Sequence, residues 1–109
     1  MTRFAFIRKL EYNFHIMRAK ELEKLFRVLG NKRRIQIIKL LLKKGELSVS
    51  EIADKINLSL KATSRHLMQL FHIDVLKKDQ RSKNVYYGIS GNLNLESKSA
   101  ISYIHHSGE

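Results

Sequence analysis

Apolar residues recur at steps of three and four along the first 44 positions, a spacing that places side chains on one face of a helix. A first series predicts an N-terminal helix over residues 1–17, formed by Phe4, Ile7, Leu10, Phe14 and Met17. A second series predicts a helix that stops at the turn signal Gly30-Asn31, formed by Leu22, Leu25, Phe26 and Leu29. The third series, Lys32–Lys44, is apolar around most of its circumference, so we expect it to be the central core helix.

The next segment has the pattern of two short helices joined by a tight turn. Ser48 and Glu51 have the Ser-x-x-Glu spacing of a capping box, which starts a helix. The apolar stripe of that helix breaks at residues 57–59, and Ser59 can cap a second helix. The inward side of the second helix is predicted to consist of Leu60, Thr63, Leu67 and Leu70. We therefore predict a helix-turn-helix unit over residues 48–72.

After residue 74 the apolar positions alternate, as they do in β-strands. Two short strands, joined by a polar link over residues 79–84, are predicted from Val75, Leu76, Val85, Tyr87 and Ile89. A last helix is predicted over residues 92–107, with one side formed by Ala100, Ile101 and Ile104. The expected fold is mainly α with a small β-hairpin, in a single domain over residues 1–109. Its parts are the helical core at 20–74 and the hairpin at 75–90, with a helix at each end.

Charge adds a partner to this picture. The 109 residues include 21 Lys and Arg against 10 Asp and Glu, a formal net charge of +11, so a polyanion is the first partner to consider. The chain has no cysteine, which excludes disulfides and thiolate metal sites. Without a glycine-rich phosphate loop or a nucleophile–base set, we expect no enzyme activity. No apolar run is long enough for a membrane span or a signal peptide, so we expect a cytoplasmic protein with no membrane partner.

The outward side of the second helix in the predicted helix-turn-helix unit suits the DNA major groove, which accommodates one helix. Arg65 can make two hydrogen bonds to guanine, Gln69 can bind adenine, and Ala62 can contact a thymine methyl group. The hairpin is expected to reach the DNA backbone or minor groove. The alternative is an ordinary solvated helix face. The candidate DNA-binding residues are Ser59, Lys61, Ala62, Ser64, Arg65, His66, Gln69, Arg81 and Lys83.

From Leu25 to Ser90 the chain resembles the arsenic-repressor (ArsR) family of winged-helix regulators. The segments that carry the resemblance are residues 25–35, 45–53, Thr63-Ser64-Arg65-His66-Leu67 and Val85-Tyr86-Tyr87. The resemblance implies a winged helix-turn-helix homodimer on double-stranded DNA, with terminal helices packed across a two-fold axis. The implied interface residues are Phe4, Ile7, Leu10, Phe14, Met17, Ile101 and Ile104. Two alternatives are that the first helix folds onto its own domain, or that translation begins at Met17.

The resemblance also raises the question of a metal sensor. Many family members bind metal through a cysteine pair, but Ser48 and Ser50 stand at those positions here, and hydroxyls are poor ligands for soft metals. The family's zinc sensors use the last helix, where His106 and Glu109 match half of the required set. We therefore expect no metal and no cofactor, and the sequence does not indicate an effector ligand.

Three residues leave the local geometry open. His66 lies beside the inward stripe of the second helix and either contacts a phosphate or packs. Asp74 and Ser82 stand where the family commonly has glycine. Asp tolerates the left-handed backbone conformation better than most residues, whereas Ser82 predicts a differently shaped wing tip.

The function predicted from these features is sequence-specific DNA binding by a transcription regulator, with repression inferred from the habit of the family. One alternative is a non-specific architectural or RNA-binding protein, which the high positive charge favours. Another is a winged-helix module that binds a protein partner.

Overall fold

The structure is a computed structural model and describes residues 17–108. The predicted N-terminal helix, with Phe4, Ile7, Leu10 and Phe14, lies outside these residues. In chain order the elements are α2 (Ala19–Leu29), α3 (Lys32–Lys44), β1 (Leu47–Ser48), α4 (Val49–Ile56), α5 (Leu60–His72), β2 (Leu76–Arg81), β3 (Asn84–Ile89) and α6 (Leu95–His106). Within the described range, no helix combines the length and apolar character needed to cross a membrane.

Local sequence signals account for the helix ends. The Asn31 side chain accepts a hydrogen bond of 3.1 Å from the Arg34 N–H and caps α3, which has the predicted bounds. Gly45 follows α3 with a φ of 85°, a conformation that residues with a Cβ rarely adopt. Helix α6 begins at Leu95 rather than at residue 92, because the Asn94 side chain accepts a hydrogen bond from the Ser97 N–H at 2.9 Å and caps the helix there.

The sheet has three antiparallel strands in the order β1-β3-β2. Strand β1, which the sequence pattern did not predict, pairs Leu47 with Tyr87. The predicted polar link over residues 79–84 is also corrected, because Arg81 pairs with Asn84 and leaves only Ser82 and Lys83 in the turn. Ser82 has a φ of 58°, so a non-glycine residue takes the left-handed conformation that this two-residue turn requires.

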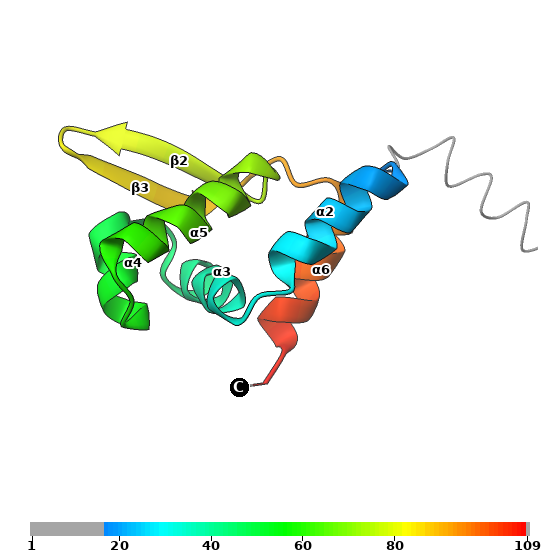
Figure 1. Ribbon diagram of the computed structural model, residues 1–109, viewed down its shortest axis with the longest axis horizontal. Coiled ribbons are helices and arrows are strands. Elements are labelled where there is room, and N and C mark those ends of the chain that lie inside the picture. The colour runs from blue at the N-terminus through cyan, green and yellow to red at the C-terminus, as the bar shows by residue number, and fades with distance from the viewer. Residues whose placement is uncertain (1–16, 109) are drawn as a thin grey trace, which may run out of the picture.

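The core lies around α3, whose Ile37, Ile38 and Leu41 are buried among residues of the sheet and of the other helices within residues 17–108. Figure 1 shows α2 and α6 together at one end of the molecule, α4 and the hairpin at the other, and α5 between them. One member of the apolar series of α2 and one predicted inward residue of α5 are exposed. Phe26 is 62% exposed on α2, and Leu60 is 58% exposed at the first position of α5, before that helix reaches the core.

Candidate nucleic-acid interface

Helix α5 is held by its first residue and by one buried face. Ser59 caps it by accepting a hydrogen bond of 3.1 Å from the Ala62 N–H, and Asn57, with a φ of 55°, makes the left-handed turn from α4. The buried face consists of Thr63, Leu67 and Leu70, three of the four residues predicted to face inward. This packing against the core determines which side of α5 points away from the protein.

The outward side of α5 carries most of the candidate DNA-binding residues. Lys61, Arg65 and Gln69 are exposed, while Ala62 and Ser64 are half-buried beside them. In the first turn of the helix there is no acidic residue. The structure therefore brings together a cationic and polar row of the kind that can reach base edges and phosphates.

His66 lies at the edge of this row and contacts the helix behind it. Its Nδ1 accepts a hydrogen bond of 3.2 Å from Arg34 Nε, and the same guanidinium donates through Nη1 to the Val28 carbonyl at 3.1 Å. Burial lowers the pKa of His66, and the nearby positive charges of Arg34, Arg33 and Arg65 lower it further. Of the two roles left open by the sequence, the packing role has direct contacts in this structure.

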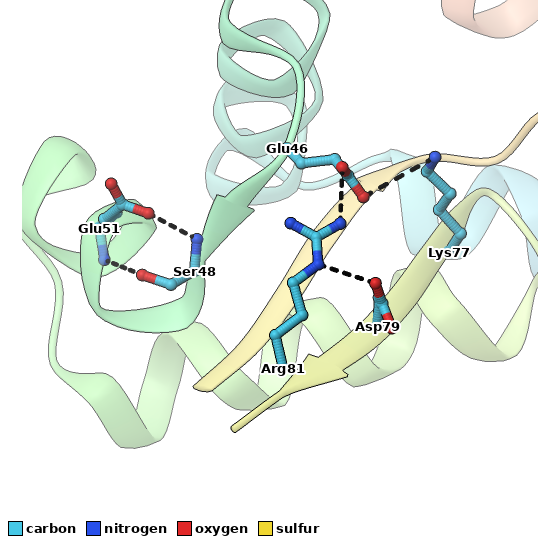
Figure 2. A network of polar contacts seen from close by, with 6 residues as sticks. All are labelled: Glu46, Ser48, Glu51, Lys77, Asp79 and Arg81. Carbon is cyan, nitrogen blue, oxygen red and sulfur yellow. Dashed lines mark hydrogen bonds and ion pairs between the residues drawn. The ribbon is translucent and has the colours of Figure 1, made fainter. Parts of the chain in front are cut away.

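The wing, formed by β2, β3 and their turn, is joined to the β1 corner by an ion-pair network. Figure 2 shows the Glu46 carboxylate between Arg81 and Lys77. Arg81 Nη2 lies 2.9 Å from Glu46 Oε1, its Nε lies 2.8 Å from Asp79 Oδ2, and Lys77 Nζ lies 3.8 Å from Glu46 Oε2. The Arg81 guanidinium also lies over the Tyr86 ring, 4.8 Å from its centroid.

This network separates the two wing residues expected on the DNA backbone. Arg81 is the last residue of β2 and is already hydrogen-bonded to two carboxylates, so its charge is largely compensated within the protein. Lys83, by contrast, is exposed in the turn at the wing tip. The two residues therefore do not present equivalent charges to a polyanion.

The base of the wing packs against α5. The Tyr87 hydroxyl donates to Met68 Sδ at 3.5 Å, and Lys78 Nζ lies 4.5 Å from the centroid of the Phe71 ring. Burial raises the pKa of Tyr87, so the hydroxyl keeps its proton and remains a donor. These contacts hold the hairpin next to α5, and Figure 1 shows the hairpin extending past α4.

At the other end of the molecule, α2, α3 and α6 line an apolar groove with a volume of about 620 Å³. Phe26, Leu95 and Tyr103 stand at this groove and are exposed, with 79% of Tyr103 accessible. Ile104 also lines it. Ile101, which we expected at a dimer interface, is only 6% exposed because it packs in the core of its own chain.

Comparison with known proteins agrees with this geometry. Residues 31–78 match the profile of bacterial regulatory proteins of the arsR family. The transcriptional activator HlyU of Vibrio cholerae is 32% identical over 96 residues, which cover 82% of this chain and 85% of HlyU. The chain belongs to the arsR family of bacterial regulatory proteins. It is a DNA-binding regulator of transcription with a winged helix-turn-helix fold.

Solved structures and a further relative give similar matches. The structure of reduced HlyU from Vibrio cholerae superposes with a TM-score of 0.67 at 30% identity, over 90% of this chain and 94% of HlyU. The cadmium resistance regulator CadC of Listeria innocua is 36% identical over 64 residues, covering 59% of this chain and 54% of CadC. The homodimeric winged helix-turn-helix domain of Mb0332 from Mycobacterium bovis shares the fold, with a TM-score of 0.67 at 23% identity over 83% of this chain and 88% of that domain.

The positions of the ArsR-family cysteine motif have a structural role in this chain. The Ser48 hydroxyl accepts a hydrogen bond from the Glu51 N–H at 3.2 Å, and the Glu51 carboxylate accepts one from the Ser48 N–H at 2.9 Å, as predicted for a capping box. Hydrogen bonding from Ser48 to the Glu51 carboxylate, chiefly from the Ser48 backbone N–H and then from its side chain, lowers the pKa of Glu51. The Ser50 hydroxyl lies 3.3 Å from that of Ser48.

The second metal position of the family lies on the last helix, α6. There His106 lies edge-on to His105, with the two ring centroids 4.8 Å apart. Glu109 lies outside the described residues. Residues 17–108 contain no group of three or more His, Cys, Asp and Glu side chains that could hold a metal ion.

Sequence reasoning missed several residues that position this ArsR-family interface. Glu46 was part of the resemblance but was given no role, because an exposed acid before a strand carries no motif. Arg33 and Arg34 were included in the resemblance but given no role. A signal was present, since Lys32, Arg33 and Arg34 occupy the first turn of α3, where the helix dipole disfavours positive charge.

Proposed function

We propose that this regulator is a homodimer that inserts α5 of each subunit into successive major grooves of a pseudo-palindromic operator. The observation that carries the proposal is the row of Lys61, Arg65 and Gln69 along the exposed side of a helix whose opposite side is buried. Arg65 and Gln69 are the residues proposed to read guanine and adenine. Ser59, Lys61, Ala62 and Ser64 are proposed to contact phosphates or base edges beside them.

The wing is proposed to contact the backbone next to the groove, with Lys83 as its main phosphate contact. Its position at the exposed turn supports this role. Arg81 was expected to share it. Because Glu46 and Asp79 already hold Arg81, we now assign it chiefly to the geometry of the wing.

Dimerisation is proposed at the apolar face of α2 and α6. Support comes from the exposed Phe26, Leu95 and Tyr103 at the groove, an arrangement rare on a monomer without a partner. The homodimeric Mb0332 domain, which has the same fold, adds to it. Ile104 and residues 1–17 are proposed to complete the interface. The alternative is that the predicted helix over residues 1–17 folds onto its own subunit.

We propose repression as the sign of regulation, because a dimer on a promoter blocks access by its volume and needs no further partner. HlyU carries the name of an activator, so the sign requires a direct measurement. A reporter gene behind a promoter that contains the selected operator decides between the two. Increased expression on induction of the regulator would overturn repression.

Since a regulator must reach bacterial DNA, we also propose that it acts in the cytoplasm, without a metal or cofactor.

The DNA-reading role is tested by selecting bound duplexes from a random pool and comparing the selected duplex with a scrambled one at the same salt concentration. We expect the wild-type protein to prefer the selected duplex, since base contacts are lost on scrambling and phosphate contacts are not. Arg65→Ala should weaken binding to the selected duplex by about 1–3 kcal/mol and remove most of the preference. Lys83→Ala should weaken binding to both duplexes by similar factors.

Equal affinity of the wild-type protein for both duplexes would refute sequence-specific reading and favour a non-specific DNA or RNA binder. Lys98→Ala is a matched control, because Lys98 is exposed on α6, and Figure 1 shows that helix at the end of the molecule opposite the wing. An equal loss with Lys98→Ala and Lys83→Ala would show that only overall charge matters.

The dimer is tested by light scattering on the full chain. Phe26→Glu places a charge on the apolar face of α2 and should convert the dimer to a monomer. Lys24→Glu changes an exposed residue of α2 that does not line the groove and should leave the dimer intact. A Phe26→Glu protein that remained dimeric would refute this interface.

A further inference from the structure

The first turn of α3 contains side chains that reach both helices of the helix-turn-helix unit. Arg33 Nη1 donates to the Ile56 carbonyl at the end of α4, at 2.6 Å. Arg34 donates through Nη1 to the Val28 carbonyl near the end of α2 and through Nε to His66 on α5. Positive charge at a helix N-terminus is unfavourable, so these contacts offset a local electrostatic cost.

The Arg34–His66 contact requires a particular state of the imidazole. An arginine keeps its proton at any pH a protein experiences, so Nε can only donate. His66 Nδ1 must therefore accept, which places the single ring proton on Nε2 and leaves the ring neutral. Protonation of Nδ1 would replace the acceptor with a second donor and break the hydrogen bond.

The charges around His66 all oppose that protonation. Arg33 and Arg34 act on it from α3 and Arg65 acts on it from α5, while α2 supplies no charge and contributes the Val28 carbonyl that holds Arg34. Among the described residues no carboxylate contributes to the shift. A protonated His66 would face guanidinium groups from two helices, so the two helices would be pushed apart at this point.

We propose that Arg34 and His66 form a proton-sensitive contact that positions the recognition helix α5, so that specific DNA binding weakens when His66 is protonated. The inference rests on the proposed function, in which α5 reads bases. Arg34 and His66 are positioning residues, because they act through the orientation of α5. Arg65 directly precedes His66 in the chain, so a rotation or shift of α5 at His66 displaces the side chain proposed to read guanine.

The sign of the pH effect differs between specific and non-specific binding. Protonation of His66 adds a positive charge, which favours any DNA through its phosphates. Loss of the contact with Arg34 moves α5 and weakens base contacts only. The ratio of specific to scrambled affinity is therefore the informative quantity, and it should fall as the pH drops below the ordinary histidine pKa of about 6.5.

The test measures this ratio for the full chain between pH 7.5 and pH 5.0 at constant ionic strength. For the wild-type protein we expect a fall of about tenfold, the order of one hydrogen bond to a charged group. His66→Asn should abolish the fall, because its Oδ1 can accept from Arg34 as Nδ1 does but does not titrate in this range. His72→Asn, which alters an exposed histidine in the last turn of the same helix, should keep the wild-type profile.

Two results would overturn the proposal: a wild-type ratio that stays constant with pH, or a His66→Asn ratio that falls as the wild-type ratio does. If the wild-type protein shows no preference for the selected duplex at pH 7.5, it is the proposed function that fails. In either of two situations, no preference at pH 7.5 or a His66→Asn protein that does not fold, a titration of the wild-type imidazoles by nitrogen NMR still shows whether the Arg34–His66 hydrogen bond forms. It should find His66 with its proton on Nε2 at pH 7.5 and shifts of the α5 amides as the ring titrates. A proton on Nδ1 would refute the contact.

Discussion

Thr63 offers a quantitative test of how α5 is held. Its side chain is completely buried on the inner face of the helix, and its Oγ1 has no hydrogen-bond partner among the described residues. Burying a hydroxyl without a partner costs about 1–3 kcal/mol in protein mutants. Thr63→Val keeps the branched shape and removes the hydroxyl. We therefore expect the free energy of unfolding to rise by about 1 kcal/mol, which raises Tm by roughly 4 °C for a domain of this size.

The assay is urea unfolding followed by circular dichroism at one subunit concentration, since the stability of a dimer depends on concentration. Thr63→Ser is the matched control, because it keeps the hydroxyl and loses a methyl group. Its free energy of unfolding should fall by about 1 kcal/mol. Lower stability of Thr63→Val than of the wild-type protein would refute the reasoning, because it would show that the hydroxyl has a partner worth more than its burial. Affinity for the selected duplex should not change, because Thr63 faces the core.

Three further predictions concern the capping box, the wing and pH. Ser48→Ala should lower the free energy of unfolding by about 1 kcal/mol in urea titrations, and Ser50→Ala by clearly less, since only Ser48 caps α4. In DNA titrations Arg81→Ala should weaken binding less than Lys83→Ala, and a larger loss would show that Arg81 reaches the phosphates itself. Folding lowers the pKa of His66, so the unfolded chain takes up the His66 proton first as the pH falls. The stability that the neutral ring contributes is therefore fully present above the unfolded pKa of about 6.5, and it is lost as the pH falls to the lowered pKa of the folded state. Urea unfolding at pH 7.5 and 5.0 should show the loss in the wild-type protein and a smaller one in His66→Asn.

Most of the helical architecture could be predicted because its signals are local. The bounds of α3 follow from Asn31 at one end and Gly45 at the other, and the capping box at Ser48 needs only four consecutive residues. The buried face of α5 follows from the helical period. The exposure of Phe26 did not follow from periodicity, which identifies an apolar face but not whether the same chain covers it.

The strands were harder to predict because they depend on pairing between distant residues. Residues 77–81 are all polar, so no alternation marks them, and they are β-structure because each lies opposite a residue of β3. Strand β1 has only two residues and exists through its pairing with Tyr86 and Tyr87. Such partners are separated by the turn or by tens of residues, and a local pattern carries no information about them.

In the candidate site, too, the features that follow from local sequence were predicted and those that depend on distant contacts were not. The exposed row on α5 was predicted because outward positions follow once the inward ones are known. The ion pairing of Arg81 was not predicted, because its partner Glu46 lies 35 residues earlier in the chain. The contact between Arg34 and His66 spans 32 residues and was equally inaccessible. The sequence therefore predicts which charges exist but not which of them are already engaged.

The ion pairs of Arg81 have a consequence for how the protein responds to ionic conditions. The affinity of a protein for DNA falls with salt in proportion to the number of phosphates it neutralises, because each such contact releases condensed counterions. A guanidinium that two carboxylates already hold displaces few of these ions. The wing should therefore contribute a smaller counterion release than its basic residues suggest, and the salt dependence of binding should be shallower than a net charge of +11 implies.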